Sequence, residues 1–150
     1  MRKRFIYVIC LTLTIVVAGM AYAQFDKPQD AIKYRQAVMI LLGHHFGKIG
    51  AALGGASEDK TIVQDARVVA MLAPLPWEAF LVPGTDNGDT TMSSKVFEDT
   101  GTFKSDAAAF EKEAIKLDQV AAGGKMDALK VQFGAVAKTC KACHGNFRNR

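Results

Sequence analysis

Long apolar runs, internal repeats and low-complexity tracts are all lacking in this chain of 150 residues. Its longest apolar run, from Phe5 to about Gly19, is shorter than the ~20 residues that a membrane-spanning helix needs. Cysteine and histidine are scarce, with three residues of each. No strand-rich pattern surrounds the two cysteines near the C-terminus. A chain of about this length fits a single globular domain.

The N-terminus has the three parts of a secretory signal peptide. A basic segment at residues 2–4 precedes the apolar run, and a small-x-small site follows it at residues 21–23. We therefore expect residues 1–23 to be removed before Gln24 and the mature protein to reside in the periplasm. An uncleaved anchor is the alternative. Cys10 lies in the removed segment, so the mature chain keeps two cysteines.

The mature chain also has no large excess of charge of either sign. The whole sequence has 19 basic and 15 acidic residues, and three of the basic residues belong to the signal peptide. The remaining net charge is therefore about +1. A chain so nearly neutral gives no reason to expect nucleic acid or, after cleavage, a membrane as a partner.

Residues 24–150 carry apolar side chains at three-four spacing, which is typical of packed helices. Asp26 is expected to cap the first helix, and a pair of glycines to end the first and the third. The segment from Pro74 to about Lys104 is expected to be a loop, with at most a short helical turn. The sequence thus predicts an all-α fold, an antiparallel up-down-up-down four-helix bundle. Its helices are expected at Pro28 to about Leu53, Ser57 or Glu58 to Ala73, about Ser105 to Ala122, and about Lys125 to Arg148.

The run Cys140-Lys141-Ala142-Cys143-His144 is a C-x-x-C-H motif, the attachment signal of c-type haem. On a helix these two cysteines and the histidine share a face, so they can supply two thioethers and an axial imidazole to one porphyrin. A redox dithiol would need a βαβ context, and a zinc site would need a fourth ligand. We predict one covalent haem c per chain, with no structural disulfide. Both cysteines continue the apolar stripe of their helix, so the haem is expected inside the bundle.

Two residues of the first helix are placed to meet such a cofactor. Arg35 lies on the apolar seam, where an uncompensated charge is expensive. A haem propionate is one possible anionic partner. The alternatives are that Arg35 extends its charged head to solvent from the helix end, or that it pairs with Asp30 or Asp118 at the surface. Met39 lies on the same seam and is the best placed methionine for the sixth position of the iron. Met39 fits equally well as a flexible side chain that packs in the core without binding the iron.

The chain resembles the class II c-type cytochromes, and among them the cytochrome c′ family. The resemblance extends over nearly the whole mature chain. It rests on these segments: Gln24-Phe25-Asp26-Lys27-Pro28, Lys33-Tyr34-Arg35-Gln36, His45-Phe46-Gly47, Leu75-Pro76-Trp77 with Phe80, Pro83-Gly84-Thr85, and the C-x-x-C-H run before Phe147-Arg148.

The resemblance implies roles for individual residues. Residues 140, 143 and 144 take the roles that the motif gives them, with His144 as the proximal ligand of the iron. Arg35 and Gln36 are expected to contact the haem propionates, and Asp89 of the middle loop to join them. Arg148 is similar to an arginine that the family keeps near the proximal imidazole.

Further implications concern packing and assembly. Trp77 and Phe80 look like packing residues around the haem, although plain core aromatics would have the same pattern. Met39 matches the position whose bulky apolar side chain covers the open face of the iron. The family usually forms a homodimer through its first two helices.

Two functions follow from this interpretation. With a five-coordinate, high-spin iron, the protein is expected to bind nitric oxide or carbon monoxide when Met39 is pushed aside, and to exchange single electrons with transient partner proteins. The alternative is a low-spin electron-transfer protein similar to cytochrome c-556, with Met39 as sixth ligand. Neither is an enzyme. His44 and His45 fall off the Met39 seam and are expected to be surface or packing residues.

Overall fold

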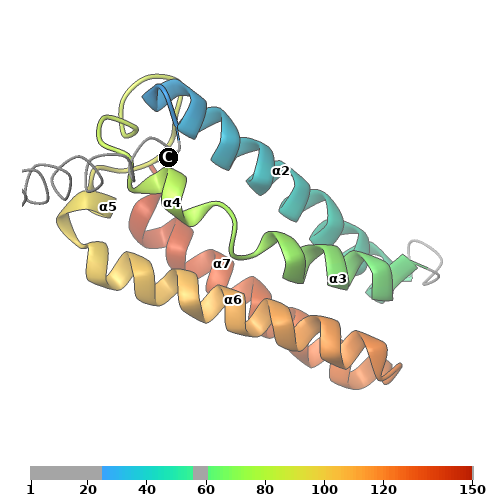
Figure 1. Ribbon diagram of the computed structural model, residues 1–150. Helices are drawn as coiled ribbons and strands as arrows, with labels where there is room; N and C mark the ends of the chain where they lie inside the picture. The colour runs from blue at the N-terminus through green and yellow to red at the C-terminus, as the bar shows by residue number, and fades with distance from the viewer. Residues whose placement is uncertain (1–24, 56–60, 150) are drawn as a thin grey trace, which may run out of the picture.

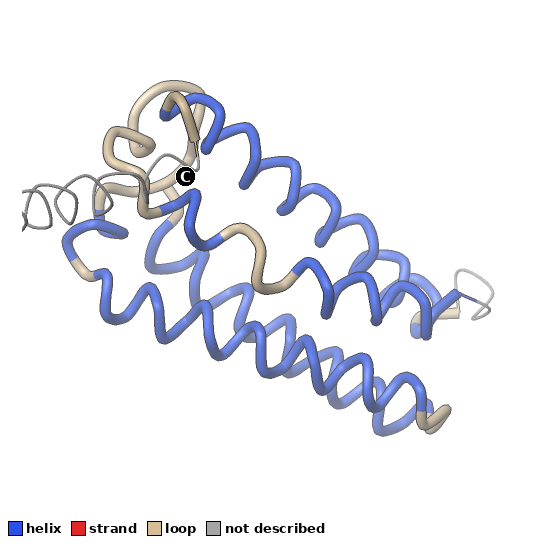
Figure 2. The backbone as a smooth tube through the Cα atoms, viewed as in Figure 1, coloured by secondary structure: helices blue, strands red, loops and turns tan. Residues whose placement is uncertain are grey.

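The computed structural model describes residues 25–55 and 61–149. The predicted signal peptide, its Cys10 and the predicted helix start at Ser57 or Glu58 lie outside these residues. Within them the chain forms helices and loops and no strand (Figure 2). The helices are α2 (Pro28–Leu53), α3 (Ile62–Leu72), α4 (Trp77–Phe80), α5 (Lys95–Glu98), α6 (Thr100–Ala122) and α7 (Met126–Phe147).

The four long helices form two layers. Helices α2 and α3 run antiparallel in one layer, and α6 and α7 run antiparallel in the other (Figure 1). The predicted antiparallel up-down-up-down four-helix bundle is therefore confirmed. Among the helices of the described residues, none combines the length and the apolar character that crossing a membrane requires.

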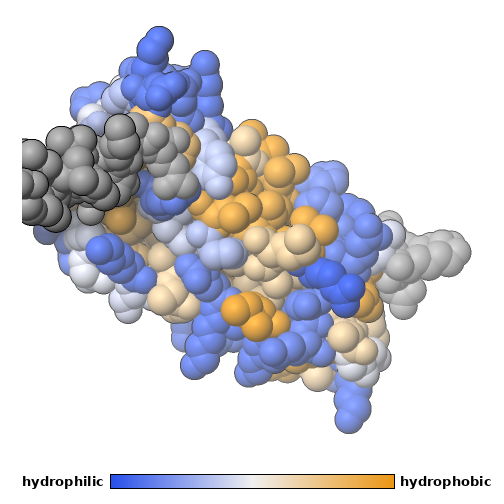
Figure 3. All heavy atoms as spheres, viewed as in Figure 1, coloured by the Kyte–Doolittle hydropathy of each residue, from blue (hydrophilic) through white to orange (hydrophobic). Residues whose placement is uncertain are grey.

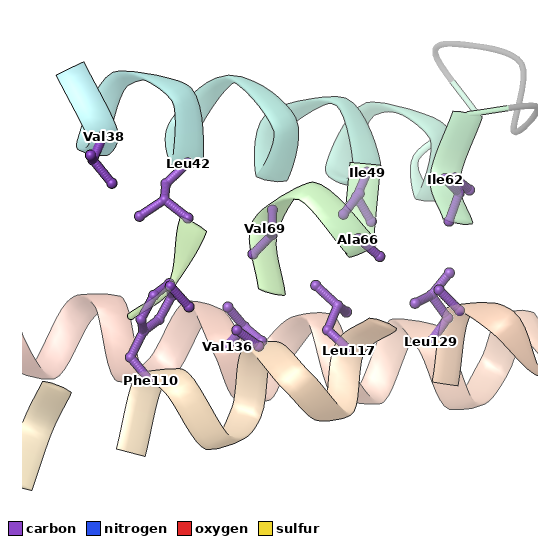
Figure 4. Close-up of a cluster of buried hydrophobic side chains, with 13 residues drawn as sticks. Val38, Leu42, Ile49, Ile62, Ala66, Val69, Phe110, Leu117, Leu129 and Val136 are labelled. Atoms are coloured by element: carbon purple, nitrogen blue, oxygen red, sulfur yellow. The ribbon is translucent and has the colours of Figure 1, made fainter. Parts of the chain in front are cut away.

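The core fills the space between the two layers. Leu42 and Ile49 point down from α2, and Leu117 and Val136 point up from α6 and α7 (Figure 4). All four are less than a tenth exposed, so water is excluded from the middle of the bundle. Small residues such as Ala66 sit between them and allow α3 to approach the opposite layer closely. The three-four spacing of the sequence is thus the spacing of this core.

The ends of the helices depart from the prediction in two places. The cap expected from Asp26 is wrong, because the capping position of α2 is Lys27, which makes no side-chain cap hydrogen bond. Helix α6 begins five residues earlier than expected, since Asp99 accepts a hydrogen bond from the backbone N–H of Thr102 at 3.0 Å. A carboxylate at that position satisfies an end donor that a first turn of Thr and Gly would leave open.

The connection between α3 and α6 is folded over one end of the bundle (Figure 1). It contains two short helices, α4 and α5, where the sequence predicted a loop with at most one helical turn. The end of the chain is tied to it, because Ser93 N–H donates to the carbonyl of Phe147 at 2.9 Å and Asn149 N–H donates to that of Thr91 at 2.8 Å. The connection is therefore part of the structure at the end of α7, where the C-x-x-C-H run lies.

Candidate haem-binding site

A cavity of about 700 Å³ lies at this end of the bundle, between α2, α4, α7 and residues 88–92 of the connection. Its volume falls in the range of sites that hold a cofactor-sized ligand. All ten residues that the sequence proposed for the site line it. They are Arg35, Gln36, Met39, Trp77, Phe80, Asp89, Cys140, Cys143, His144 and Arg148.

Helix α7 supplies the wall that carries the two thiols. Cys140 and Cys143 are both free and half-buried, one turn apart on the side that faces the cavity. Burial raises the pKa of Cys143 to about 11, helped by Asp106 and Cys140, and burial also raises the pKa of Cys140. A catalytic dithiol needs a lowered thiol pKa, so the redox-dithiol alternative loses support.

His144 follows on the same wall. Burial and the nearby positive charge of Arg148 lower the pKa of His144. A lowered pKa favours the neutral imidazole, which is the form that ligates a metal. In the described residues no group of three or more His, Cys, Asp or Glu side chains could hold a metal ion, so the zinc alternative lacks a ligand set.

Helix α2 supplies the opposite wall, and Arg35 is its charged member. This side chain is only 2% exposed. Its guanidinium donates to the backbone carbonyls of Ala79 at 3.1 Å and of Thr85, and to Thr90 Oγ1 at 2.8 Å. Burial lowers the pKa of Arg35, while the charge of Asp86 raises it.

The surface carboxylates proposed as alternative partners of Arg35 lie elsewhere. Its described hydrogen bonds include none to Asp30 or Asp118, and Asp118 lies 3.8 Å from Arg67 instead. Helix α4 and the connection after it therefore supply the partners of Arg35 in place of these two carboxylates. Three neutral acceptors hold the guanidinium in place at the cavity wall but leave its positive charge without a bonded anion in the described residues.

Gln36 and Asp89 come together at the rim. The side-chain amide of Gln36 donates to the backbone carbonyl of Asp89 at 2.8 Å. Both line the cavity beside Arg35. The structure thus places the three predicted propionate contacts next to one another, although they come from two segments more than fifty residues apart.

A haem fits the chemistry of this cavity. Its walls are largely aromatic and aliphatic, the thiols and imidazole lie on one side, and the buried cation lies on the other. Trp77 Nε1 is buried and has no hydrogen-bond partner among the described residues. A buried N–H without an acceptor is costly, and a propionate oxygen would satisfy it. This orphan N–H favours the predicted role of Trp77 beside the haem, which stays a prediction.

Sequence analysis missed several residues of the site. Phe103 and Phe147 pack edge to face with ring centroids 5.5 Å apart, and Phe103 also contacts Trp77 and Phe80. Met92, 4% exposed, joins this second apolar cluster from the connection. Phe147 was among the residues that carry the family resemblance but was given no role at the site, whereas Phe103 fell in the segment predicted as a loop, because α6 begins five residues earlier than expected. Met92 had no sequence signal, because its segment has no helical period.

The two histidines of α2 lie away from the cavity. His45 Nδ1 is 2.7 Å from Asp65 Oδ1, and Lys48 Nζ donates to the same oxygen at 2.9 Å. His44 stacks edge to face against His45. Neither histidine lines the cavity, in agreement with the expectation that they are surface or packing residues. The ion-pair cluster around the buried Asp65 instead fastens α2 to α3.

The fold and the cavity together define a four-helix-bundle protein of the c-type haem class. The family model described as Cytochrome C' matches residues 30–148, and the chain belongs to the cytochrome c′ family. Its cofactor is accordingly one covalent haem c. Cytochrome c′ of Alcaligenes xylosoxydans xylosoxydans is 37% identical, with 85% of this chain and 99% of the relative covered. That of Rubrivivax gelatinosus is 35% identical, with 85% and 100% covered.

Solved structures give the same result. Cytochrome c prime from Shewanella frigidimarina is similar with a TM-score of 0.81 and 34% identity, over 85% of this chain and all of that one. A nitric oxide complex of a variant of cytochrome c prime from Alcaligenes xylosoxidans is similar with a TM-score of 0.78 and 36% identity, over 85% of this chain and 99% of that one. A carbon-monoxide-bound variant of the latter protein also has a TM-score of 0.78 at 36% identity, over 85% and 100%.

Proposed function

We propose that this protein is a periplasmic cytochrome c′ with a five-coordinate, high-spin haem that binds nitric oxide or carbon monoxide and exchanges single electrons. When bound, the haem supplies an iron that takes a diatomic ligand and changes oxidation state by one electron. The observation that carries the proposal is the position of Met39. Its half-buried side chain lines the cavity from α2, whereas His144 lines it from α7.

The apolar walls determine what can bind. Met39, Phe46 and Val69 line the cavity with apolar side chains, and a ligand that binds beside them is expected to displace the flexible one, Met39. Small neutral diatomics suit such a site better than charged or larger ligands. Relatives with nitric oxide and carbon monoxide complexes support this assignment. The proposed role is binding and electron exchange, without catalysis on a substrate.

The second candidate is a low-spin protein in which Met39 is the sixth ligand. The position of Met39 in the cavity wall supports this candidate, since a thioether ligand raises the reduction potential and keeps the iron six-coordinate. Both candidates use the same cavity and the same cofactor. They differ in whether the Met39 thioether binds the iron.

Optical spectra of the purified holoprotein decide between the two. A charge-transfer band near the far-red edge in the oxidised form, with a broad unsplit reduced band, is expected for five-coordinate iron. Carbon monoxide should then shift the reduced spectrum. A sharp, split reduced band that converts to the broad form in Met39→Leu would establish methionine ligation and overturn the first candidate.

We also propose a homodimer formed through α2 and α3. Ile40, Leu41 and Val63 are 70%, 46% and 43% exposed on these helices. Figure 3 shows apolar residues gathered over the middle of α2 on this face. Apolar side chains exposed together are typical of a surface that a second chain covers.

Export to the periplasm, which rests on the predicted signal peptide, is tested by fractionating cells that express the full sequence.

A further inference from the structure

The near-neutral charge of the mature chain conceals a strong asymmetry. After Asp127 the sequence has five basic residues and no acidic one. Residues 24–127 have eleven basic and fifteen acidic residues. Helix α7, which carries the C-x-x-C-H run, is therefore positive while the rest of the protein is negative. A local excess of this kind attracts anionic partners even when the net charge is small.

The positive charges of α7 lie on one face. Positions 130, 134, 138, 141 and 145 are three or four residues apart, so they follow one another along one side of α7, and Arg148 comes directly after the helix ends at Phe147. All six are exposed. We call this surface the basic face; it consists of Lys130, Gly134, Lys138, Lys141, Gly145 and Arg148.

Asp127, in the first turn of α7 and three residues before Lys130, is an acidic residue at the start of the basic face. The acidic side chains of α6 contact the other side of α7. Asn146 donates to Asp106 at 3.3 Å, and Gln132 donates to Glu113 at 2.7 Å. These contacts mark the side of α7 that packs on α6. In the part of the chain that the structure describes, the ion pairs include none with Lys130, Lys138 or Lys141. Among the described residues, Lys130, Lys138 and Lys141 therefore have no ion-pair partner.

The two glycines of the basic face are not required by packing. A Cβ atom at Gly134 or Gly145 would meet no other atom within 4 Å. Gly50 of α2 is different, because a Cβ there would lie 2.9 Å from the ring of Phe133. Glycine within a helix costs about 1 kcal/mol relative to alanine. At positions 134 and 145 no packing contact within the bundle requires the glycine. The absence of a side chain there lets another molecule approach the helix backbone closely between the lysines.

The basic face adjoins the wall that holds the cofactor. Lys141 lies between Cys140 and Cys143, and Arg148 lies one turn beyond His144. We propose that the basic face is the docking surface for an acidic one-electron carrier protein. In the exchange one electron passes from the reduced carrier to iron(III), so that the carrier is oxidised by one electron and the haem iron becomes iron(II). This inference rests on the proposed electron-transfer function.

Charge and shape select this occupant. In a symmetric pair of copies two basic faces would repel each other, and the exposed apolar residues proposed for the dimer lie on α2 and α3 instead. An acidic protein is attracted, and orientation by charge raises association rates by about 10 to 10³ at low ionic strength. Electron transfer needs contact that is fast and transient, which surface charges provide better than a dry apolar interface.

The test measures the reduction of the oxidised holoprotein by flavodoxin hydroquinone, an acidic one-electron donor, in stopped flow. The double variant Lys130→Glu with Lys138→Glu reverses two charges and leaves the haem attachment residues in place. The matched control is Lys112→Glu with Lys116→Glu on α6, where both lysines are exposed among acidic residues. Hexaammineruthenium(II), a small cationic donor, is used in parallel. Haem content and spectra are compared first.

We expect reduction of the wild type by flavodoxin to slow at least about tenfold as the salt concentration rises, because screening shortens the reach of the charges. The Lys130/Lys138 variant should be about tenfold slower at low salt, and faster with hexaammineruthenium(II). The Lys112/Lys116 control should change less than about twofold. Gly134→Leu adds bulk without charge, and should slow reduction by flavodoxin but not by the ruthenium complex.

Three results would overturn the proposal. One is equal slowing by the two double variants, which would mean that net charge alone acts. Another is binding of the holoprotein to vesicles containing phosphatidylglycerol that depends on Lys130 and Lys138 while reduction by flavodoxin does not, which would assign the face to an anionic membrane. A wild type that neither donor reduces would end the electron-transfer function itself, and with it the docking role.

Discussion

The guanidinium of Arg35 lies over the ring of Phe80, with its central carbon 4.7 Å from the ring centroid. The contact joins α2 to α4 at the wall of the haem cavity. A cation over an aromatic face is stabilised by the electrons of the ring, more so where water is excluded. The buried charge is thus held by a ring and by three oxygen acceptors, and the connection between α3 and α6 is held with it.

Removal of Arg35 should loosen that connection. Arg35→Met leaves the carbonyls of Ala79 and Thr85 without their donor, so we expect the free energy of unfolding of the holoprotein to fall by about 2–4 kcal/mol. Arg35→Lys should recover less than half of the loss, because an ammonium group does not reproduce the planar fork. Urea titration measures both. Arg67→Met, at an exposed arginine, is the control; an equal loss there would contradict the assignment.

Substitution of Trp77 tests whether the haem accepts a hydrogen bond in this cavity, because the sign of the change in unfolding free energy depends on it. Trp77→Phe keeps an aromatic ring against Phe103 and Phe110 but removes the buried Nε1–H. If the cofactor accepts this hydrogen bond, the holoprotein should lose about 1 kcal/mol of unfolding free energy. Urea unfolding checks the value. A neutral or stabilising substitution would mean that the N–H has no acceptor in the holoprotein.

Met39 is expected to control access to the iron. Met39→Ala removes the side chain that a gas must displace, and a barrier lower by about 1.4 kcal/mol raises the rate tenfold. We therefore expect carbon monoxide to bind the reduced holoprotein about tenfold faster, as measured by flash photolysis. Met71→Ala, at a methionine that is 68% exposed on α3, serves as the control. Unchanged binding in Met39→Ala would remove this residue from the ligand path.

The cluster around Asp65 predicts a dependence of stability on pH. Burial raises the pKa of Asp65, but hydrogen bonds from His45, Lys48 and Thr61 outweigh it and hold the pKa below the usual value. A carboxylate with a lowered pKa in the folded state stabilises the protein above about pH 4, and this contribution is lost as the pH falls through the folded-state pKa.

Asp65→Asn tests that contribution. At pH 7 we expect a loss of about 1–3 kcal/mol, since its partners are partly exposed and a neutral amide replaces a buried anion. At acidic pH the difference from the wild type should shrink. Urea titrations at several pH values measure both. The same difference at every pH would show that the charge of Asp65 is unimportant.

The proposed dimer can be separated from the stability of the bundle. Leu41→Glu with Val63→Glu places two charges on the exposed face of α2 and α3, and a like-charged pair of copies should then stay apart. Sedimentation velocity should report a monomer for this variant and a dimer for the wild type. Val131→Glu, at a side chain that is 77% exposed on α7, should leave the dimer intact. A monomeric wild type would refute the proposal.

Much of the fold could be predicted from the local spacing of apolar residues, because a helix repeats every 3.6 residues and its buried face repeats with it. The span of α2 agrees with the sequence prediction at both ends. The glycine pairs also behave as expected, with Gly55 and Gly124 at positive φ just after α2 and α6. The start of α6 was missed, since its cap depends on the single hydrogen bond at Asp99.

The sequence by itself determined the cofactor and its point of attachment, because three side chains within one helical turn carry the chemistry of haem binding. It also determined that the bundle would be helical. Only the tertiary structure decided what faces the attachment site. Arg35 and Gln36 reach carbonyls of the α3–α6 connection, Met92 enters the cavity wall, and Trp77 Nε1 is buried without a partner among the described residues. These contacts join segments that have no common periodicity, so their pairing depends on how the layers pack and not on any local pattern.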